Sequence, residues 1–176
     1  AKGIPPLHSN KYRIFHPTTN LFSKLYLCRM LLDDEYFMRA ALAEAKEAYA
    51  QDEVPIGAVI VANGKIIARG HNLVEKLKDV TAHAEMMAFT AASENLGGKF
   101  LNDCVLYVTL EPCPMCAGAA YWSRIGKVVF GASDEKRGFS QVEGVKKILH
   151  PSTEVRGGVL ATECAALLSE YFQSKR

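Results

Sequence analysis

The chain has 176 residues, of which 49% are hydrophobic and 23% charged, and these proportions are typical of one soluble globular domain with a sizeable core. No apolar run approaches the length of a membrane span, so we expect a soluble protein. The net charge is +2, but residues 1–29 hold five cations and no acid. The rest of the chain therefore has 16 cations against 19 acids, and its bulk charge gives no support for nucleic-acid binding.

Residues 1–29 form an N-terminal extension, and residues 30–176 form the domain. The extension has no helical period and contains three prolines, whereas Met30 precedes an acidic segment that is typical of a helix start. Three interpretations stay open for the extension. It is a leader or misassigned start, which we favour, a transit-like peptide that is basic but poor in Arg and Ser, or a functional arm.

The first half of the domain predicts a helix and a hairpin. Apolar residues recur at helical spacing over residues 33–51, which indicates an amphipathic helix. Two apolar runs, at residues 54–61 and 65–70, flank Asn63-Gly64, the strongest short signal for a β-hairpin. A polar loop follows, up to residue 80.

The second half alternates helices and strands. We expect a helix from Thr81, its N-cap, to about Asn95, a strand over 104–110, a helix from Cys113 to about Gly126, a strand over 127–131, a short helix over 141–149, a strand over 155–160 and a last helix over 162–173. This order predicts an α/β fold, a mixed five-stranded sheet with helices on both faces.

Two motifs supply the ligands of a metal site. Residues 83–85 (His-Ala-Glu) offer an imidazole and a carboxylate, and residues 112–116 (Pro-Cys-Pro-Met-Cys) offer two thiols. Both motifs open helices, and strand-to-helix turns cluster at one edge of an α/β sheet, so they can converge. We therefore expect one Zn²⁺ per chain, held by His83, Cys113 and Cys116. The pair of motifs is the known signature of zinc nucleobase deaminases.

A carboxylate is left over beside this ligand set. Three protein ligands leave the fourth position of a tetrahedral zinc site to a water molecule, whose pKa the metal lowers to roughly 7. Glu85 lies two residues from the ligand His83 and is not needed as a ligand. It can therefore carry protons from the water to a ring nitrogen and to departing ammonia, as hydrolytic deamination requires.

Two other uses of the same residues are weaker. A closed structural zinc site needs a fourth ligand, for which His71 is the available histidine, and a redox C-x-x-C pair leaves His83 and Glu85 unused. An odd count of five cysteines argues against a disulfide framework and for a reducing compartment, the cytoplasm. Cys104 and Cys164 lie in apolar runs and are expected to be buried thiols.

Longer strings around these motifs carry a family resemblance. They are residues 53–59, 70–73, 81–85, 107–113, 115–119, 123–126, 129–132, 134–136 and 163–168. In them the chain resembles the bacterial tRNA-specific adenosine deaminases of the cytidine deaminase superfamily. The resemblance implies a three-layer α-β-α cytidine deaminase-like fold, a homodimer, and conversion of adenosine to inosine at the wobble position of a tRNA anticodon stem-loop.

The resemblance also implies substrate contacts. Asn72 would hydrogen-bond the flipped base, Asp134 and Lys136 would lie on a loop near the target nucleotide, and Tyr171 and Phe172 would pack near neighbouring anticodon bases. The residues alone leave ordinary structural roles open: the Asn and Asp side chains can cap a turn or a helix, and the two aromatic side chains can belong to the core.

The pattern departs from this family in its substrate loops. Val74 stands where a basic residue is frequent, and residues 138–141 and 151–154 differ from the usual segments. Residues 120–122 (Ala-Tyr-Trp), followed by Arg124, resemble bacterial guanine deaminases of the same fold. A guanine or free-nucleoside deaminase is therefore the alternative function, and a non-catalytic zinc-stabilised RNA-binding module is the second alternative.

Overall fold

A five-stranded sheet forms the centre of the computed structural model, which describes residues 33–142 and 148–176. Its strands are β1 (Gly57–Ala62), β2 (Lys65–His71), β3 (Cys104–Leu110), β4 (Lys127–Ala132) and β5 (Glu154–Arg156). The order across the sheet is β2-β1-β3-β4-β5, with β1 antiparallel to both neighbours and β4 parallel to both of its own. The mixed sheet expected from the sequence is confirmed.

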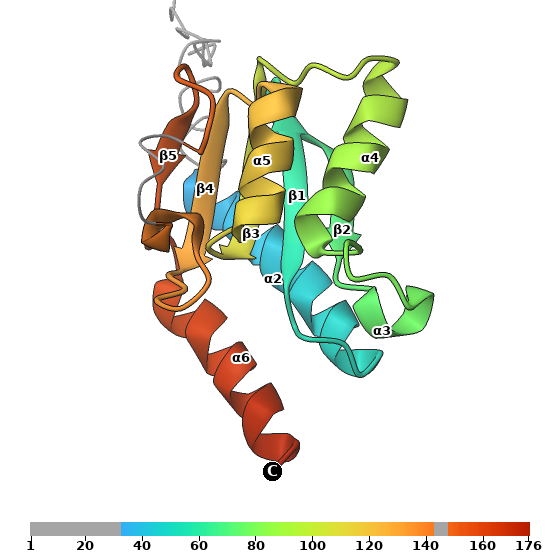
Figure 1. Ribbon diagram of the computed structural model, residues 1–176, viewed down its shortest axis with the longest axis vertical. Coiled ribbons are helices and arrows are strands. Elements are labelled where there is room, and N and C mark those ends of the chain that lie inside the picture. Colours follow the sequence, from blue (N-terminus) through green and yellow to red (C-terminus); the bar gives the residue numbers. More distant parts are fainter. Residues whose placement is uncertain (1–32, 143–147) are drawn as a thin grey trace, which may run out of the picture.

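Helices cover both faces of this sheet (Figure 1). They are α2 (Asp34–Ala50), α3 (Val74–Leu77), α4 (Ala84–Leu96), α5 (Pro114–Ser123) and α6 (Ala161–Ser174), with a 3₁₀ turn at Phe139–Gln141. Alternate residues of β1 point to opposite faces: Ile60 joins the core under α4 and α5, and Val59 joins the core under α2 and α6. Both faces are buried, which explains the continuous apolar run of this strand. Within the described residues, no helix has the length and apolarity that crossing a membrane requires.

Several predicted boundaries are wrong. Thr81 does not cap α4; its hydroxyl donates to Asp79 and His83 occupies the N-cap position. The helix expected to reach Gly126 ends at Ser123, because Arg124 adopts a left-handed conformation with φ of 53°. The polar loop after β2 contains the short helix α3.

The last part of the chain also differs from expectation. The strand expected over 155–160 is the three-residue β5. Of the helix expected over 141–149, Gln141 belongs to the 3₁₀ turn, residues 142, 148 and 149 are not helical, and residues 143–147 lie outside the described part of the chain. The extension proposed for residues 1–29 lies outside it entirely.

The strand directions bring three connections to one edge of the sheet. β2 and β3 both pair antiparallel with β1, so they run the same way, and β4 is parallel to β3. The three strands therefore end at the same edge, where ligands bind in open α/β sheets. Asn72, residues 111–113 and the loop after Ala132 follow these strand ends directly.

Asp34 ties the first turn of α2 to the sheet. Its carboxylate accepts hydrogen bonds from the Tyr107 hydroxyl (2.7 Å), Lys127 Nζ (3.4 Å) and Arg156 Nη1 (2.6 Å). Burial alone would raise the pKa of this carboxyl, but the Tyr107 hydrogen bond and the two cations outweigh burial, and the pKa lies below 3.8. One side chain thus links α2 to β3, β4 and β5.

We predict that Asp34→Asn lowers the free energy of unfolding at pH 7 by about 1–2 kcal/mol, because it removes a charged acceptor shared by three donors. A carboxyl whose pKa is lowered by folding stabilises the protein above its unfolded pKa, so the difference from wild type should persist down to about pH 4 and shrink only below that value. Urea unfolding at a series of pH values measures it. The control is Glu35→Gln, which removes an exposed ion pair with Arg39 and should change little. Equal stability of Asp34→Asn and wild type at pH 7 would refute the prediction.

Candidate active site

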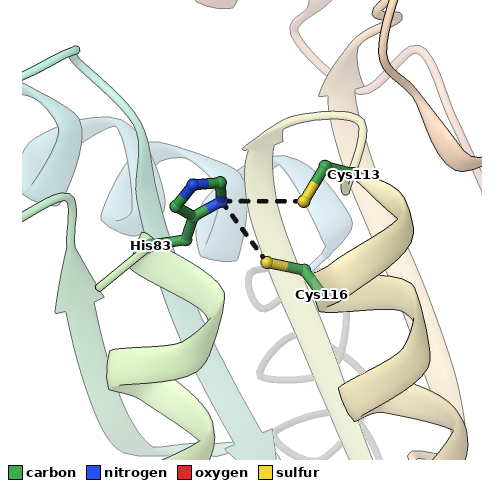
Figure 2. Close-up of side chains that lie close together, drawn as sticks. All are labelled: His83, Cys113 and Cys116. Atoms are coloured by element: carbon green, nitrogen blue, oxygen red, sulfur yellow. Dashed lines mark hydrogen bonds between the residues drawn. The ribbon is translucent and has the colours of Figure 1, made fainter. Parts of the chain in front are cut away.

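The three predicted metal ligands converge between the first turns of α4 and α5 (Figure 2). His83 Nδ1 lies 3.7 Å from Cys113 Sγ and 3.6 Å from Cys116 Sγ. In a tetrahedral zinc site with usual bond lengths, neighbouring N and S ligand atoms are roughly 3.5–3.8 Å apart. The donor set and its spacing therefore fit Zn²⁺.

Local backbone geometry explains why these side chains are available. His83 and Cys113 are the N-cap residues of their helices, with extended backbone and no side-chain capping bond, so imidazole and thiol remain free to bind a metal. Pro114 fits the first turn of α5, where no amide hydrogen is required. Cys116, one turn on, is buried and faces the same side as Cys113.

Hydrogen bonds divide the protons unequally within the ligand set. The Cys116 thiol donates to Cys113, which together with His83 lowers the pKa of Cys113 to about 4. The same hydrogen bond, and burial, raise the pKa of Cys116. The hydrogen bond with Cys113 also raises the pKa of His83. In the metal-free site these shifts favour the thiolate form of Cys113 and the protonated forms of Cys116 and His83, and a metal that binds all three must displace those protons.

Glu85 is buried next to the ligands and is not one of them. It lies in the first turn of α4 with 4% of its surface exposed, and burial is the main cause of its raised pKa. Among the described residues, the converging ligand atoms are those of the two cysteines and His83, without a fourth protein ligand. His71 instead contacts Glu44 and Gln51. The described residues thus give no support to a closed zinc site.

Asn72 follows β2 and has an unsatisfied oxygen. The residue is 4% exposed, and its amide N–H donates to the Ile56 carbonyl (3.1 Å). Its side-chain Oδ1 has no hydrogen-bond partner among the described residues. A buried acceptor without a partner costs about 1–3 kcal/mol, so this atom is available to a ligand that brings a donor.

The loop after β4 holds the other two polar candidates. Asp134 Oδ1 accepts the backbone N–H groups of Lys136 and Arg137, both at 3.0 Å, so this carboxylate caps a turn. Lys136 and Arg137 are exposed. The structural role left open for Asp134 is therefore present, and contact of Asp134 and Lys136 with a substrate stays a prediction.

The two aromatic candidates lie on α6. Tyr171 is 8% exposed, and its hydroxyl donates to the Asp52 carbonyl (2.9 Å), while its ring packs edge-on against Tyr49 of α2. Tyr171 therefore fastens α6 to the end of α2. Phe172 is 51% exposed and free to contact a partner, so its role at an anticodon base stays a prediction.

One polar residue of this edge was missed from the sequence. Glu111 is 3% exposed and accepts the backbone N–H groups of Asp134 (3.1 Å) and Ser140 (3.0 Å). The available signal was its position, an acid directly after an apolar strand and next to the Pro-Cys motif. Cys104 and Cys164, in contrast, are buried as expected.

Comparison with known proteins gives a consistent set of relatives. Residues 32–132 match the family described as the cytidine and deoxycytidylate deaminase zinc-binding region. The tRNA-specific adenosine deaminase of Bacillus subtilis (strain 168) is 49% identical over 150 residues, 83% of this chain and 92% of the relative. A structure solved in a study of A-to-I editing by tRNA:A34 deaminases is 43% identical, with a TM-score of 0.70, over 75% of this chain and 98% of that chain. The guanine deaminase structure from Bacillus subtilis is 46% identical, with a TM-score of 0.56, over 57% of this chain and 65% of that chain.

We predict that zinc affinity falls as the pH is lowered from 8 to 6, by about tenfold or more per pH unit, because His83 and Cys116 must release protons to bind. Competition with a chromophoric chelator at each pH measures the apparent dissociation constant. Cys116→Ser should lose stoichiometric zinc, whereas Cys104→Ala, which removes a buried thiol outside the ligand set, should keep it. An affinity that does not depend on pH would contradict this assignment of the protons.

Proposed function

Because the chain belongs to the cytidine and deoxycytidylate deaminase family, we propose that it is a zinc-dependent hydrolase that converts adenosine to inosine at the wobble position of a tRNA anticodon. The observation that carries the proposal is the buried Glu85 beside the converging His83, Cys113 and Cys116. This arrangement lies in a chain that is nearly half identical to a tRNA-specific adenosine deaminase over most of its length.

The residues divide the chemistry between them. Zinc held by His83, Cys113 and Cys116 would activate water as a Lewis acid. Glu85 takes a proton from the attacking water, passes it to a ring nitrogen of adenine, and later delivers a proton to the departing amino group, so that adenosine and water give inosine and ammonia. Burial raises the pKa of Glu85 toward neutral pH, where a group can both accept and donate a proton efficiently.

The substrate side of the proposal rests on the sheet edge. The unsatisfied Asn72 Oδ1 offers an acceptor to a base brought to the zinc. Lys136 and Arg137 are exposed on the adjacent loop and suit a phosphate backbone. The match to the tRNA:A34 deaminase structure covers 98% of that chain, which supports tRNA as the substrate.

A guanine deaminase is the second candidate. The segment of Tyr121, Trp122 and Arg124 resembles those enzymes, and the guanine deaminase from Bacillus subtilis is 46% identical. That match covers 57% of this chain, and the guanine deaminase structure from Nitrosomonas europaea covers 78% of it at 28% identity. The tRNA-specific adenosine deaminase of Bacillus subtilis is 49% identical over 83% of this chain, which is why we place the tRNA enzyme first.

We also propose a homodimer in the cytoplasm. Four large apolar side chains are exposed on α4, α5 and the connection between them: Leu96, Phe100, Met115 and Trp122. These two helices form one layer of the molecule (Figure 1), and Phe100 and Trp122 line one hollow on the surface, so a second copy packed on this layer would cover these aromatic side chains. The four described cysteines are free thiols, which suits a reducing compartment.

We predict that Glu85→Gln lowers inosine formation by at least about 10²-fold, because the amide cannot carry the proton. Its zinc content should remain that of the wild-type protein, since Glu85 is outside the ligand set. Mass spectrometry of a tRNA anticodon stem-loop, with metal analysis, measures both quantities. Glu94→Gln changes an exposed carboxylate of the same helix and serves as the control.

The same assay decides between the candidate functions. Wild-type protein is offered the stem-loop, free adenosine and guanine. Turnover of guanine alone would reverse the order of the two candidates, and full activity of Glu85→Gln would remove the proposed mechanism.

We predict that Trp122→Glu, which replaces the most exposed of these four apolar side chains with a charged one, shifts the protein from dimer to monomer in light-scattering measurements. Lys46→Glu on α2, on the opposite face of the sheet, should leave the measured molecular mass at that of the dimer. A wild-type protein that is monomeric at micromolar concentration would refute the dimer.

A further inference from the structure

Glu111 holds a buried carboxylate that the proposed mechanism does not use. It lies between β3 and Cys113, and only 3% of its surface is exposed. Both of its oxygens accept backbone N–H groups from one loop: Oε2 from Asp134 at 3.1 Å and Oε1 from Ser140 at 3.0 Å. The two donors lie six residues apart, so the 134–140 loop closes around the carboxylate.

Further bonds tie the same loop to the metal-binding turn. The Phe139 N–H donates to the Pro112 carbonyl (2.9 Å), one residue before the ligand Cys113. Within the loop, the Gly138 N–H donates to the Asp134 carbonyl (2.9 Å). The position of the loop relative to Cys113 therefore depends on the acceptors that residues 111 and 112 offer to its N–H groups.

Gly138 shows how closely the 134–140 loop packs against the Glu111 carboxylate. A Cβ atom on this residue would lie 2.4 Å from Glu111 Cδ and 2.6 Å from each carboxylate oxygen. The φ of Gly138 is −62°, which any residue can adopt, so contact with Glu111 and not backbone conformation is what excludes a side chain.

We propose that Glu111 is a positioning residue. Its carboxylate fixes the 134–140 loop against the turn that carries Cys113, and the loop then presents the exposed cations Lys136 and Arg137 to the phosphate backbone of an RNA substrate. The inference rests on the proposed function for its substrate. It implies that Glu111 governs how tightly RNA is held, whereas the rate of the chemical step depends on Glu85 and the metal ligands.

We predict that Glu111→Gln raises the KM for an anticodon stem-loop by about tenfold and leaves kcat within about twofold, because a carboxamide cannot accept from both amides and the loop loses its fixed position. Zinc content should not change. Amide hydrogen exchange at Asp134 and Ser140 should become at least about tenfold faster in the same protein without RNA. Glu94→Gln makes the same charge change at an exposed position outside the loop and is the matched control.

Gly138→Ala disturbs the contact between Glu111 and the 134–140 loop without changing charge. This variant tests the proposed role of Glu111 if Glu111→Gln does not fold. Its methyl group displaces the carboxylate or the loop, so KM should rise in the same direction. Gly98→Ala, with open space around its Cβ position, is the control.

The outcomes separate the two proposals. Faster exchange together with a higher KM supports the role of Glu111. Unchanged exchange, a KM equal to that of the Glu94→Gln control, or a loss of kcat together with zinc would overturn it. A wild-type protein that does not deaminate the stem-loop would count against the proposed function and against RNA positioning, whereas the exchange data would still report whether Glu111 anchors the loop.

Discussion

The meeting of two helix N-termini at one sheet edge is the constraint on which the site depends. α4 and α5 each begin with a metal-binding residue in the N-cap position, and both pack on the same face of the sheet. Residues 83 and 113 are thereby brought within bonding range of one ion, although 30 positions separate them in the chain. α4 packs mainly on β2 and β1, and α5 shares a buried core with residues of β1, β3 and β4, so the sheet fixes the distance between the two helix starts.

Much of this arrangement was predictable from local pattern. The apolar runs identified the central strands, and Asn63-Gly64 joins β1 to β2 as expected. The zinc ligands were identified because metal chemistry restricts residue type and spacing so strongly. Helix ends were less predictable: the ligand His83 replaced Thr81 as the N-cap, and Arg124 ended α5 early by adopting a conformation that is uncommon for a residue with a side chain.

The roles of the residues expected to contact a substrate were harder to predict, because these roles depend on contacts between distant segments. For Asp134 the sequence leaves both a substrate contact and a capping role open, and only the folded chain shows that its carboxylate caps a turn. Tyr171 looks like a partner for RNA, yet its hydroxyl is engaged by the backbone of Asp52. The position of Glu111 after an apolar strand does not reveal its role, since only the folded chain shows that its two oxygens accept hydrogen bonds from a loop more than twenty residues away. Sequence patterns report the periodicity of elements well and report such long-range hydrogen bonds poorly.

The two outer strands of the sheet have a consequence for solubility. An open sheet exposes unpaired backbone groups at both edges, and these can recruit strands from other molecules into aggregates. Here β5 is only three residues long and includes Glu154 and Arg156, while the opposite edge strand, β2, carries the exposed Lys65 and Arg69. Short length at one edge and charge at both discourage strand addition. The sheet can therefore stay open, with the carboxyl ends of β2, β3 and β4 accessible to a ligand, while its two outer strands resist pairing with strands of other molecules.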